Sequence, residues 1–207
     1  MSRTPETLPP RFMGTLAYLP PHAHGNRSLT WWGMMGLVAI ESTVFVLAVA
    51  AYFYLATHAP EWPPHKLLPD LLPGSLFTLV VLASMIPNIW VKHAAEQENL
   101  RYVRVGLVLM SLIGIAMLPI RYYEFVALNT AWSDSAYGSI TVTLLGLHTV
   151  HLVTDLFDTL VLTALMFTSH AKGRRYVDVA ENALYWNFVV VAWLPIYAVL
   201  YFAPRLL

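Results

Sequence analysis

Residues 30–57 read TWWGMMGLVAIESTVFVLAVAAYFYLAT and contain one ionisable side chain, Glu41. The hydrocarbon core of a bilayer is ~30 Å thick, and a helix needs roughly 20 residues to cross it. An uninterrupted apolar stretch of this length does not fit the ~10-residue alternating strands of a membrane barrel. Because backbone groups in lipid must be satisfied within the segment itself, the stretch predicts a transmembrane helix.

Four further apolar stretches of comparable length follow along the chain. They cover residues 72–92, 103–128, 137–169 and 184–203, and the segments between them are rich in Pro, Gly, Asp, Asn and charged residues. The fold class predicted is therefore all-α: a polytopic bundle of five transmembrane helices within residues 30–207. Pro87, Pro119 and Pro195 fall inside three of the spans and predict kinks there. Residues 1–29 are polar and contain several prolines, which predicts an arm that does not span the membrane and is not a cleavable signal.

The composition excludes several functional classes. Hydrophobic residues make up 57% of the chain, charged residues 12%, and the formal net charge is zero. A mean hydropathy of +0.58 argues against a water-soluble enzyme. No basic surface is expected that would attract nucleic acid. The absence of cysteine excludes disulfides and thiolate-held metals.

The distribution of basic residues predicts the orientation. One side of the membrane carries Lys or Arg in the arm, between the second and third spans, and between the fourth and fifth; these are Arg3, Arg11, Arg27, Lys92, Arg101, Arg104, Lys172, Arg174 and Arg175. The other side carries only Lys66 and Arg205. Since cytoplasmic loops hold the basic excess, the N-terminus is expected in the cytoplasm and the C-terminus outside.

Ionisable residues inside the spans are the candidates for function, because an unpaired charge there is costly. Glu41 lies ~14 Å into the first span, near the midplane. The fourth span contains His148, His151, Asp155 and Asp158, which fall within an arc of about 80° and are expected to face protein. Glu41 facing His148 or His151 would be the simplest way to offset the cost.

A second candidate pair lies on the third span. Arg121 and Glu124 are three residues apart and therefore share one helix face. Their position at the end of the span favours an ion pair at the outer membrane interface.

Three kinds of site are compatible with Glu41, His148 and His151. His-x-x-His with a carboxylate is a possible zinc or iron site, although only one such motif occurs in the chain. Intramembrane Glu and His are also typical of proton relays and transporters. The third possibility is a structural network that fixes helix packing and holds a lipid headgroup.

Four ordered motifs resemble the cytochrome c oxidase subunit III family. They are Trp32-Gly33-Met34 with Glu41-Ser42-Thr43-Val44-Phe45, then Arg121-Tyr122-Tyr123-Glu124-Phe125, then Tyr137-Gly138-Ser139 with Gly146-Leu147-His148-Thr149-Val150-His151-Leu152, and finally Tyr185-Trp186-Asn187-Phe188-Val189-Val190-Val191-Ala192-Trp193. The resemblance covers about residues 30–203 and fits the short, five-helix form of the family. The chain departs from the family pattern at Asn187, where His is usual, at Val190, where Asp is usual, and at Asp155, where a small residue is more common.

The resemblance implies a non-catalytic accessory subunit of a haem–copper terminal oxidase. In this reading haem and copper belong to partner subunits I and II, this chain holds no cofactor of its own beyond structural phospholipid, and it stabilises the catalytic subunit and sustains its proton uptake. Glu41 then matches the family's midspan carboxyl, His148 and His151 its paired histidines, and Glu124 its outer carboxyl. Trp186 and Asn187 lie in its closing motif. A bacterial cytoplasmic membrane is the expected location.

Two alternatives stay open from the sequence. A subunit-III-like accessory protein of nitric oxide reductase has the same short form. A stand-alone small transporter is a third possibility, although the chain shows no inverted repeat and no paired helix breaks at corresponding positions.

Overall fold

A computed structural model describes residues 29–168 and 174–207, and this part of the chain is helical without any strand. The elements are α1 (Leu29–His58), a short 3₁₀ turn η2 (Pro64–Lys66), α2 (Leu71–Ala83), α3 (Met85–Glu96), α4 (Leu100–Val126), α5 (Ala136–Met166), α6 (Arg174–Tyr197), a π-helical segment η3 (Ala198–Phe202) and α7 (Ala203–Leu206). The predicted arm lies outside the described residues, except for its last position. The last residue of the fourth predicted span, 169, and the four that follow it also lie outside them.

Five segments are long and apolar enough to cross a membrane, which confirms the predicted all-α fold with five spans. The second span consists of α2 and α3 together, and the fifth runs from α6 through α7. This fifth span begins at Arg175, well before the predicted start at residue 184. Its first turns carry charged residues that lower the hydropathy without interrupting the helix, and Arg175 pairs with Asp178 one turn later at 2.9 Å.

The three prolines that predict kinks affect their helices differently. The break between α2 and α3 falls at Ser84, one turn before Pro87. Proline lacks an N–H and its ring crowds the carbonyl four residues earlier, here Ala83, so the helix ends at that residue. In contrast, α4 continues through Pro119 and α6 through Pro195, and the π-helical segment begins shortly after Pro195.

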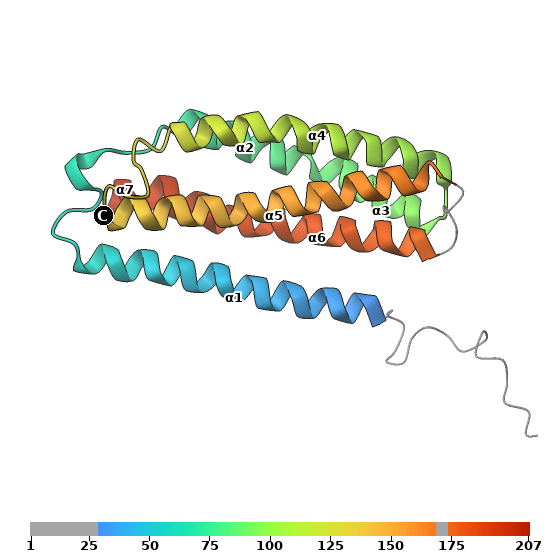
Figure 1. Cartoon of the computed structure of the whole chain (residues 1–207), viewed down its shortest axis with the longest axis horizontal. Coiled ribbons are helices and arrows are strands. Elements are labelled where there is room, and N and C mark those ends of the chain that lie inside the picture. Colours follow the sequence, from blue (N-terminus) through green and yellow to red (C-terminus); the bar gives the residue numbers. More distant parts are fainter. Residues whose placement is uncertain (1–28, 169–173) are drawn as a thin grey trace, which may run out of the picture.

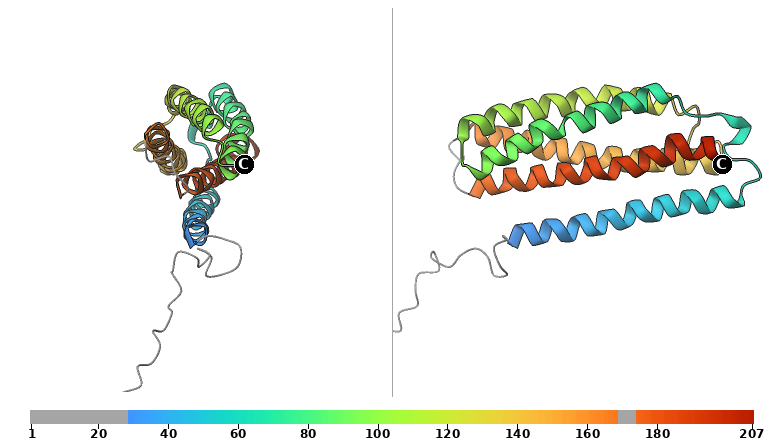
Figure 2. Two further views of the ribbon diagram at one scale, coloured as in Figure 1. Left: turned by 90° about the vertical axis from the view of Figure 1, so that its right-hand side faces the viewer. Right: turned by 180° about the vertical axis from the view of Figure 1, so that it is seen from behind.

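Four membrane-crossing segments surround a common core, and α1 lies outside this group. The end-on view shows α2/α3, α4, α5 and α6 arranged around one another, with α1 beside α6 (Figure 2). Helix α1 packs against α5 and α6. Few residues of its most apolar stretch are buried against the rest of the chain. The faces of α1 directed away from the bundle are therefore available to lipid or to a neighbouring subunit.

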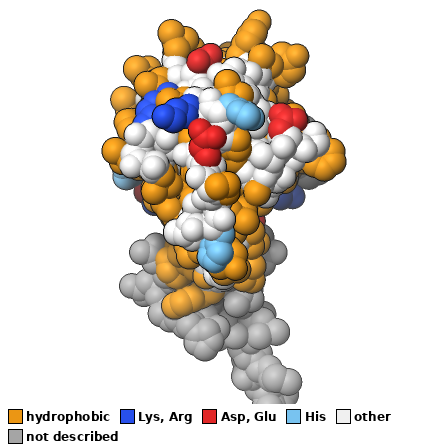
Figure 3. All heavy atoms as spheres, turned by 90° about the vertical axis from the view of Figure 1, so that its left-hand side faces the viewer, with side chains coloured by type: hydrophobic (Ala, Val, Ile, Leu, Met, Phe, Trp, Pro, Cys, Tyr) orange, Lys and Arg blue, Asp and Glu red, His pale blue; other side chains and the backbone are white. Residues whose placement is uncertain are grey.

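The two ends of the bundle carry different connections. The start of α1, the α3–α4 connection, the end of α5 and the start of α6 lie at one end (Figure 1). The α1–α2 connection, the α4–α5 connection and the C-terminus lie at the other end, where acidic, basic and histidine side chains gather among apolar ones (Figure 3). Consecutive spans that cross a membrane in opposite directions place successive connections at alternate ends, as seen here.

The space around Gly138 and Gly146 on α5 differs, so replacing each with alanine should have opposite effects on stability. A Cβ on Gly138 would collide with the backbone oxygen of Ala131, whereas a Cβ on Gly146 meets nothing within 4 Å. We expect Gly138→Ala to lower the free energy of unfolding by about 1–3 kcal/mol through overpacking. Gly146→Ala should be neutral or stabilising by up to about 1 kcal/mol, because alanine favours a helix over glycine. Unfolding by SDS in mixed micelles, followed by far-UV circular dichroism, measures both, and equal effects of the two variants would contradict the packing argument.

Candidate functional site: two buried polar clusters

Arg121 and Glu124 form an ion pair near the end of α4, but the pair does not lie at a surface. Arg121 Nη1 is 2.7 Å from Glu124 Oε2, and the side chains are only 2% and 0% exposed. The pair therefore lies inside the bundle, while its predicted depth at the outer membrane interface stays a prediction. The residues share a helix face as expected, yet that face is directed into the bundle and not toward the membrane surface.

Neighbouring helices complete the surroundings of this pair. Tyr201 donates a hydrogen bond to Glu124 Oε1 at 2.8 Å, so both carboxylate oxygens are used. The guanidinium lies 3.6 Å from the centre of the Phe77 ring and 4.3 Å from that of Trp193. These distances are typical of cation–π contacts, which strengthen when the cation is removed from water. The pair is thus electrically neutral and enclosed by α2, α6 and the segment that follows it.

His148 on α5 is the fourth member of this group, which we call the Arg121 cluster (Arg121, Glu124, His148 and Tyr201). Its Nδ1 lies 2.8 Å from Arg121 Nη2, and its Nε2 lies 3.0 Å from the backbone oxygen of Val189. A guanidinium can only donate and a carbonyl can only accept. Nδ1 must therefore be the acceptor and Nε2–H the donor, which fixes His148 as one neutral tautomer joining α4 to α6.

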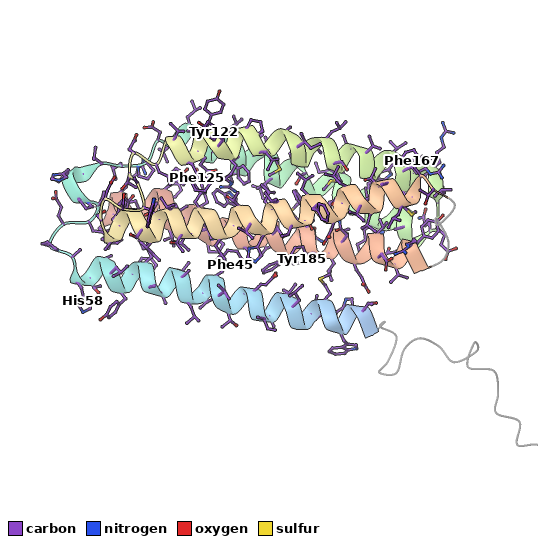
Figure 4. The ribbon with its side chains drawn as sticks, viewed as in Figure 1. Phe45, His58, Tyr122, Phe125, Phe167 and Tyr185 are labelled. Carbon is purple, nitrogen blue, oxygen red and sulfur yellow. The ribbon has the colours of Figure 1, made fainter. Side chains whose placement is uncertain are left out.

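Glu41 belongs to a separate group, the Glu41 cluster, which consists of Glu41, His151 and Tyr185. Tyr185 donates to Glu41 Oε2 at 2.8 Å, and His151 Nε2 is 3.7 Å from Glu41 Oε1. Of the two histidines that Glu41 was expected to face, the structure places only His151 beside it. Tyr185 and Phe45 project into the space between α1 and the rest of the bundle (Figure 4), and the Phe45 ring centre is 4.8 Å from that of His151.

The hydrogen bond of His151 to its own helix shows which of its ring nitrogens faces Glu41. Its Nδ1 is 2.7 Å from the carbonyl oxygen of Leu147, so Nδ1 carries a hydrogen and donates it. Nε2 is therefore the ring nitrogen that faces Glu41 Oε1.

Asp155 and Asp158 differ in their surroundings although both belong to the predicted polar stripe. Asp155 is 1% exposed, and neither of its carboxylate oxygens has a hydrogen-bond partner among the described residues. Asp158 is exposed. The expectation that the whole stripe faces protein is therefore wrong for Asp158, which lies at the edge of the arc and is exposed.

Trp186 and Asn187 join α6 to both sides of the α2/α3 break. Trp186 Nε1 donates to Ser84 Oγ at 2.9 Å. Asn88 donates to Asn187 Oδ1 at 2.9 Å and to the backbone oxygen of Ala183 at 2.8 Å. The side chains of Ser84 and Asn88, which lie on either side of Pro87, thus find hydrogen-bond partners on α6. Their geometry indicates a packing role.

Several residues of these clusters are not singled out by the sequence argument. Tyr201, Phe77 and Trp193 surround Arg121, while Tyr185 binds Glu41. Tyr185 and Trp193 lie in a quoted motif, but nothing in the sequence assigns Tyr185 to Glu41 or Trp193 to Arg121. For Tyr201 the sequence offers no signal other than its position near the end of a predicted span.

The arrangement of these residues does not favour a metal site. Within residues 29–168 and 174–207, no group of three or more His, Asp or Glu side chains could hold a metal ion. The two members of the His-x-x-His motif bind different partners, since His148 contacts Arg121 and His151 faces Glu41. The clusters instead connect α1, α4, α5 and α6 through hydrogen bonds and close contacts.

Fold and clusters together define a polytopic helical membrane protein whose embedded charges are largely partnered between its own helices. The sequence model for cytochrome c oxidase subunit III matches residues 17–204, and the chain belongs to that family. It is 28% identical over 178 residues to cytochrome c oxidase subunit 3 of Drosophila yakuba, an alignment that covers 82% of this chain and 68% of the relative. It is 23% identical over 188 residues to the subunit of the same name from Thermostichus vulcanus, covering 89% of this chain and 92% of the relative.

Proposed function

We propose that this chain is a non-catalytic accessory subunit of a terminal oxidase, placed beside haem- and copper-bearing subunits I and II in a bacterial cytoplasmic membrane. It stabilises the catalytic subunit, sustains its proton uptake and holds structural phospholipid. Family membership supports assignment to a cytochrome c oxidase complex. The observation that carries the accessory role is that Arg121 bonds Glu124 and His148, and His148 bonds the backbone of Val189, which links α4, α5 and α6. Such groups hold helices together and leave little for chemistry on a substrate.

Purification of the tagged chain in a mild detergent tests this function. An optical difference spectrum and metal analysis of the eluate identify the companions. Haem and copper arriving with other subunits support the oxidase assignment. Haem with non-haem iron and no copper would instead support association with a nitric oxide reductase. A colourless chain that purifies alone would contradict both and make the Glu41 cluster a candidate transport site.

The structural role proposed for Glu41 predicts a mild effect of Glu41→Gln. Glutamine keeps an oxygen for Tyr185 and places an amide donor toward His151 Nε2, so both contacts in the cluster survive. We expect haem spectra and the initial rate of oxygen consumption to stay nearly unchanged, while activity over many turnovers or thermal stability declines. Respirometry of the purified complex, from the first seconds until activity is lost, measures both phases.

Glu41→Ala provides the comparison because it removes both contacts, and it should shorten sustained activity more than Glu41→Gln does. Thr43→Ala is the matched control on the same helix, since Thr43 is exposed and bonds only its own helix backbone at Ala39. Immediate loss of turnover in Glu41→Gln, with the complex still assembled, would rule out the structural role and favour direct proton transfer through this carboxyl.

A further inference from the structure

A groove opens between the beginning of α4 and the end of α5, apart from both polar clusters. It encloses about 550 Å³ and is lined by Leu100, Arg101, Arg104, Val105, Val108 and Phe167. Arg101, Val105 and Phe167 are exposed, so their side chains are accessible from outside this chain. In Figure 4, Phe167 lies at the end of α5 beside the start of α4.

The groove combines two cationic side chains with apolar ones, and its apolar wall continues along α4 beyond the arginines. Arg101 and Arg104 lie in the first turns of α4, at the end of its membrane span. Val108 lies about 12 Å further along the helix than Leu100, at 1.5 Å per residue. The groove therefore has two cations near the end of the span, with Phe167 beside Arg104, and an apolar wall that extends inward from Val105 to Val108.

Arg104 is held in place by the protein itself. Its Nε donates to the carbonyl oxygen of Met166 at 2.7 Å, and its guanidinium carbon lies 5.1 Å from the centre of the Phe167 ring. The bond to Met166 uses one of the five N–H donors of the guanidinium. A phosphate oxygen can be bound by the remaining donors, because guanidinium groups match the geometry of phosphate.

We propose that this groove binds one anionic phospholipid, with its phosphate on Arg101 and Arg104 and an acyl chain along Val105, Val108 and Phe167. The described side chains that line the groove include two cations and no carboxylate, so a negatively charged headgroup complements them. The groove also lies at the end of the bundle that the basic residues predict to be cytoplasmic. This inference rests on the lipid-binding part of the proposed function and not on the identity of the companion subunits.

Lipid exchange on the purified complex tests the site. The complex is stripped of bound lipid in detergent, incubated with vesicles of phosphatidylcholine alone or of phosphatidylcholine with phosphatidylglycerol, and re-isolated. We expect one phosphatidylglycerol per complex to be retained at this site against excess phosphatidylcholine. In Arg101→Gln its affinity should fall about fivefold, which corresponds to the ~1 kcal/mol that one basic residue contributes near anionic lipid.

Two further variants make the result specific. Val108→Trp fills the apolar part of the groove while leaving both arginines, and it should reduce retention although the charge is unchanged. Lys92→Gln is the matched control: it removes one positive charge at the same end of the bundle, outside the groove, and should leave retention unchanged. Unchanged retention in both Arg101→Gln and Val108→Trp would overturn the proposal.

Equal retention of phosphatidylcholine would also overturn it, because it would indicate a general lipid annulus. If the isolated chain retains the lipid and the assembled complex does not, another subunit covers the groove, which contradicts the proposal equally. Haem content measured on the same samples shows whether assembly failed, so failure of the lipid site and failure of the proposed function are distinguishable.

Discussion

Replacing Arg121 with methionine is expected to lower the free energy of unfolding by about 3–5 kcal/mol, because it leaves Glu124 charged and buried without its cation. The side chains are 2% and 0% exposed, so water does not compensate for the lost partner. His148 Nδ1 loses its donor as well. The measurement is unfolding of the chain by SDS in mixed micelles, followed by far-UV circular dichroism, together with the yield of assembled complex.

Arg175→Met is a close control for this prediction. Arg175 and Asp178 have the same three-residue spacing and a similar distance of 2.9 Å, but their side chains are 41% and 37% exposed. An exposed pair contributes at most about 1 kcal/mol, so this variant should unfold almost as the parent does. Comparable losses in the two variants would show that burial does not decide the strength of the pair.

The double variant Arg121→Met with Glu124→Gln separates the cost of the orphaned charge from the loss of attraction. Glutamine is neutral and keeps an acceptor for Tyr201. We expect the double variant to be more stable than Arg121→Met alone, since removing both charges of a buried pair costs less than removing one. A double variant less stable than the single one would indicate that Glu124 has a further positive partner.

Hydropathy and length were sufficient to predict the number of membrane spans, because both follow from the thickness of the bilayer and need no tertiary information. Helix boundaries were harder to predict. The fifth span begins at Arg175 because charged residues can continue a helix beyond the apolar region. The α2/α3 break depends on Pro87 and on how Asn88 and Ser84 find partners on α6, and only the assembled bundle shows this.

The candidate site was only partly predictable for a similar reason. Helical periodicity placed His148, His151 and Asp155 on one face, and spacing placed Arg121 beside Glu124. Periodicity cannot tell which helix lies opposite, so it did not show that His148 pairs with Arg121 while His151 faces Glu41. Tyr201, which lies 77 positions along the chain from Glu124, illustrates a contact that only folding creates.

Replacing Asp155 with leucine is expected to raise the free energy of unfolding by about 1–3 kcal/mol, the cost of a buried polar group left without a hydrogen bond. Neither oxygen of Asp155 has such a partner within the described part of the chain. Protonation would remove the charge but not the missing bonds. Asp155→Asn keeps the shape and an unpartnered amide, so its stability should lie between those of the parent and Asp155→Leu. The same SDS titration compares all three.

Thr159→Val is the matched control, because Thr159 lies one turn further along the same face of α5 and is also buried. Its hydroxyl accepts a hydrogen bond from Asn182 at 2.9 Å, so its removal should destabilise where removal of the Asp155 carboxyl stabilises. Destabilisation by Asp155→Leu would contradict the assignment of this carboxyl as unpartnered. A substitution that relieves an unfavourable buried group commonly reduces activity when that group serves the mechanism. If Asp155→Leu stabilises the chain but shortens the sustained turnover of the complex, Asp155 is therefore retained for function at a cost in stability.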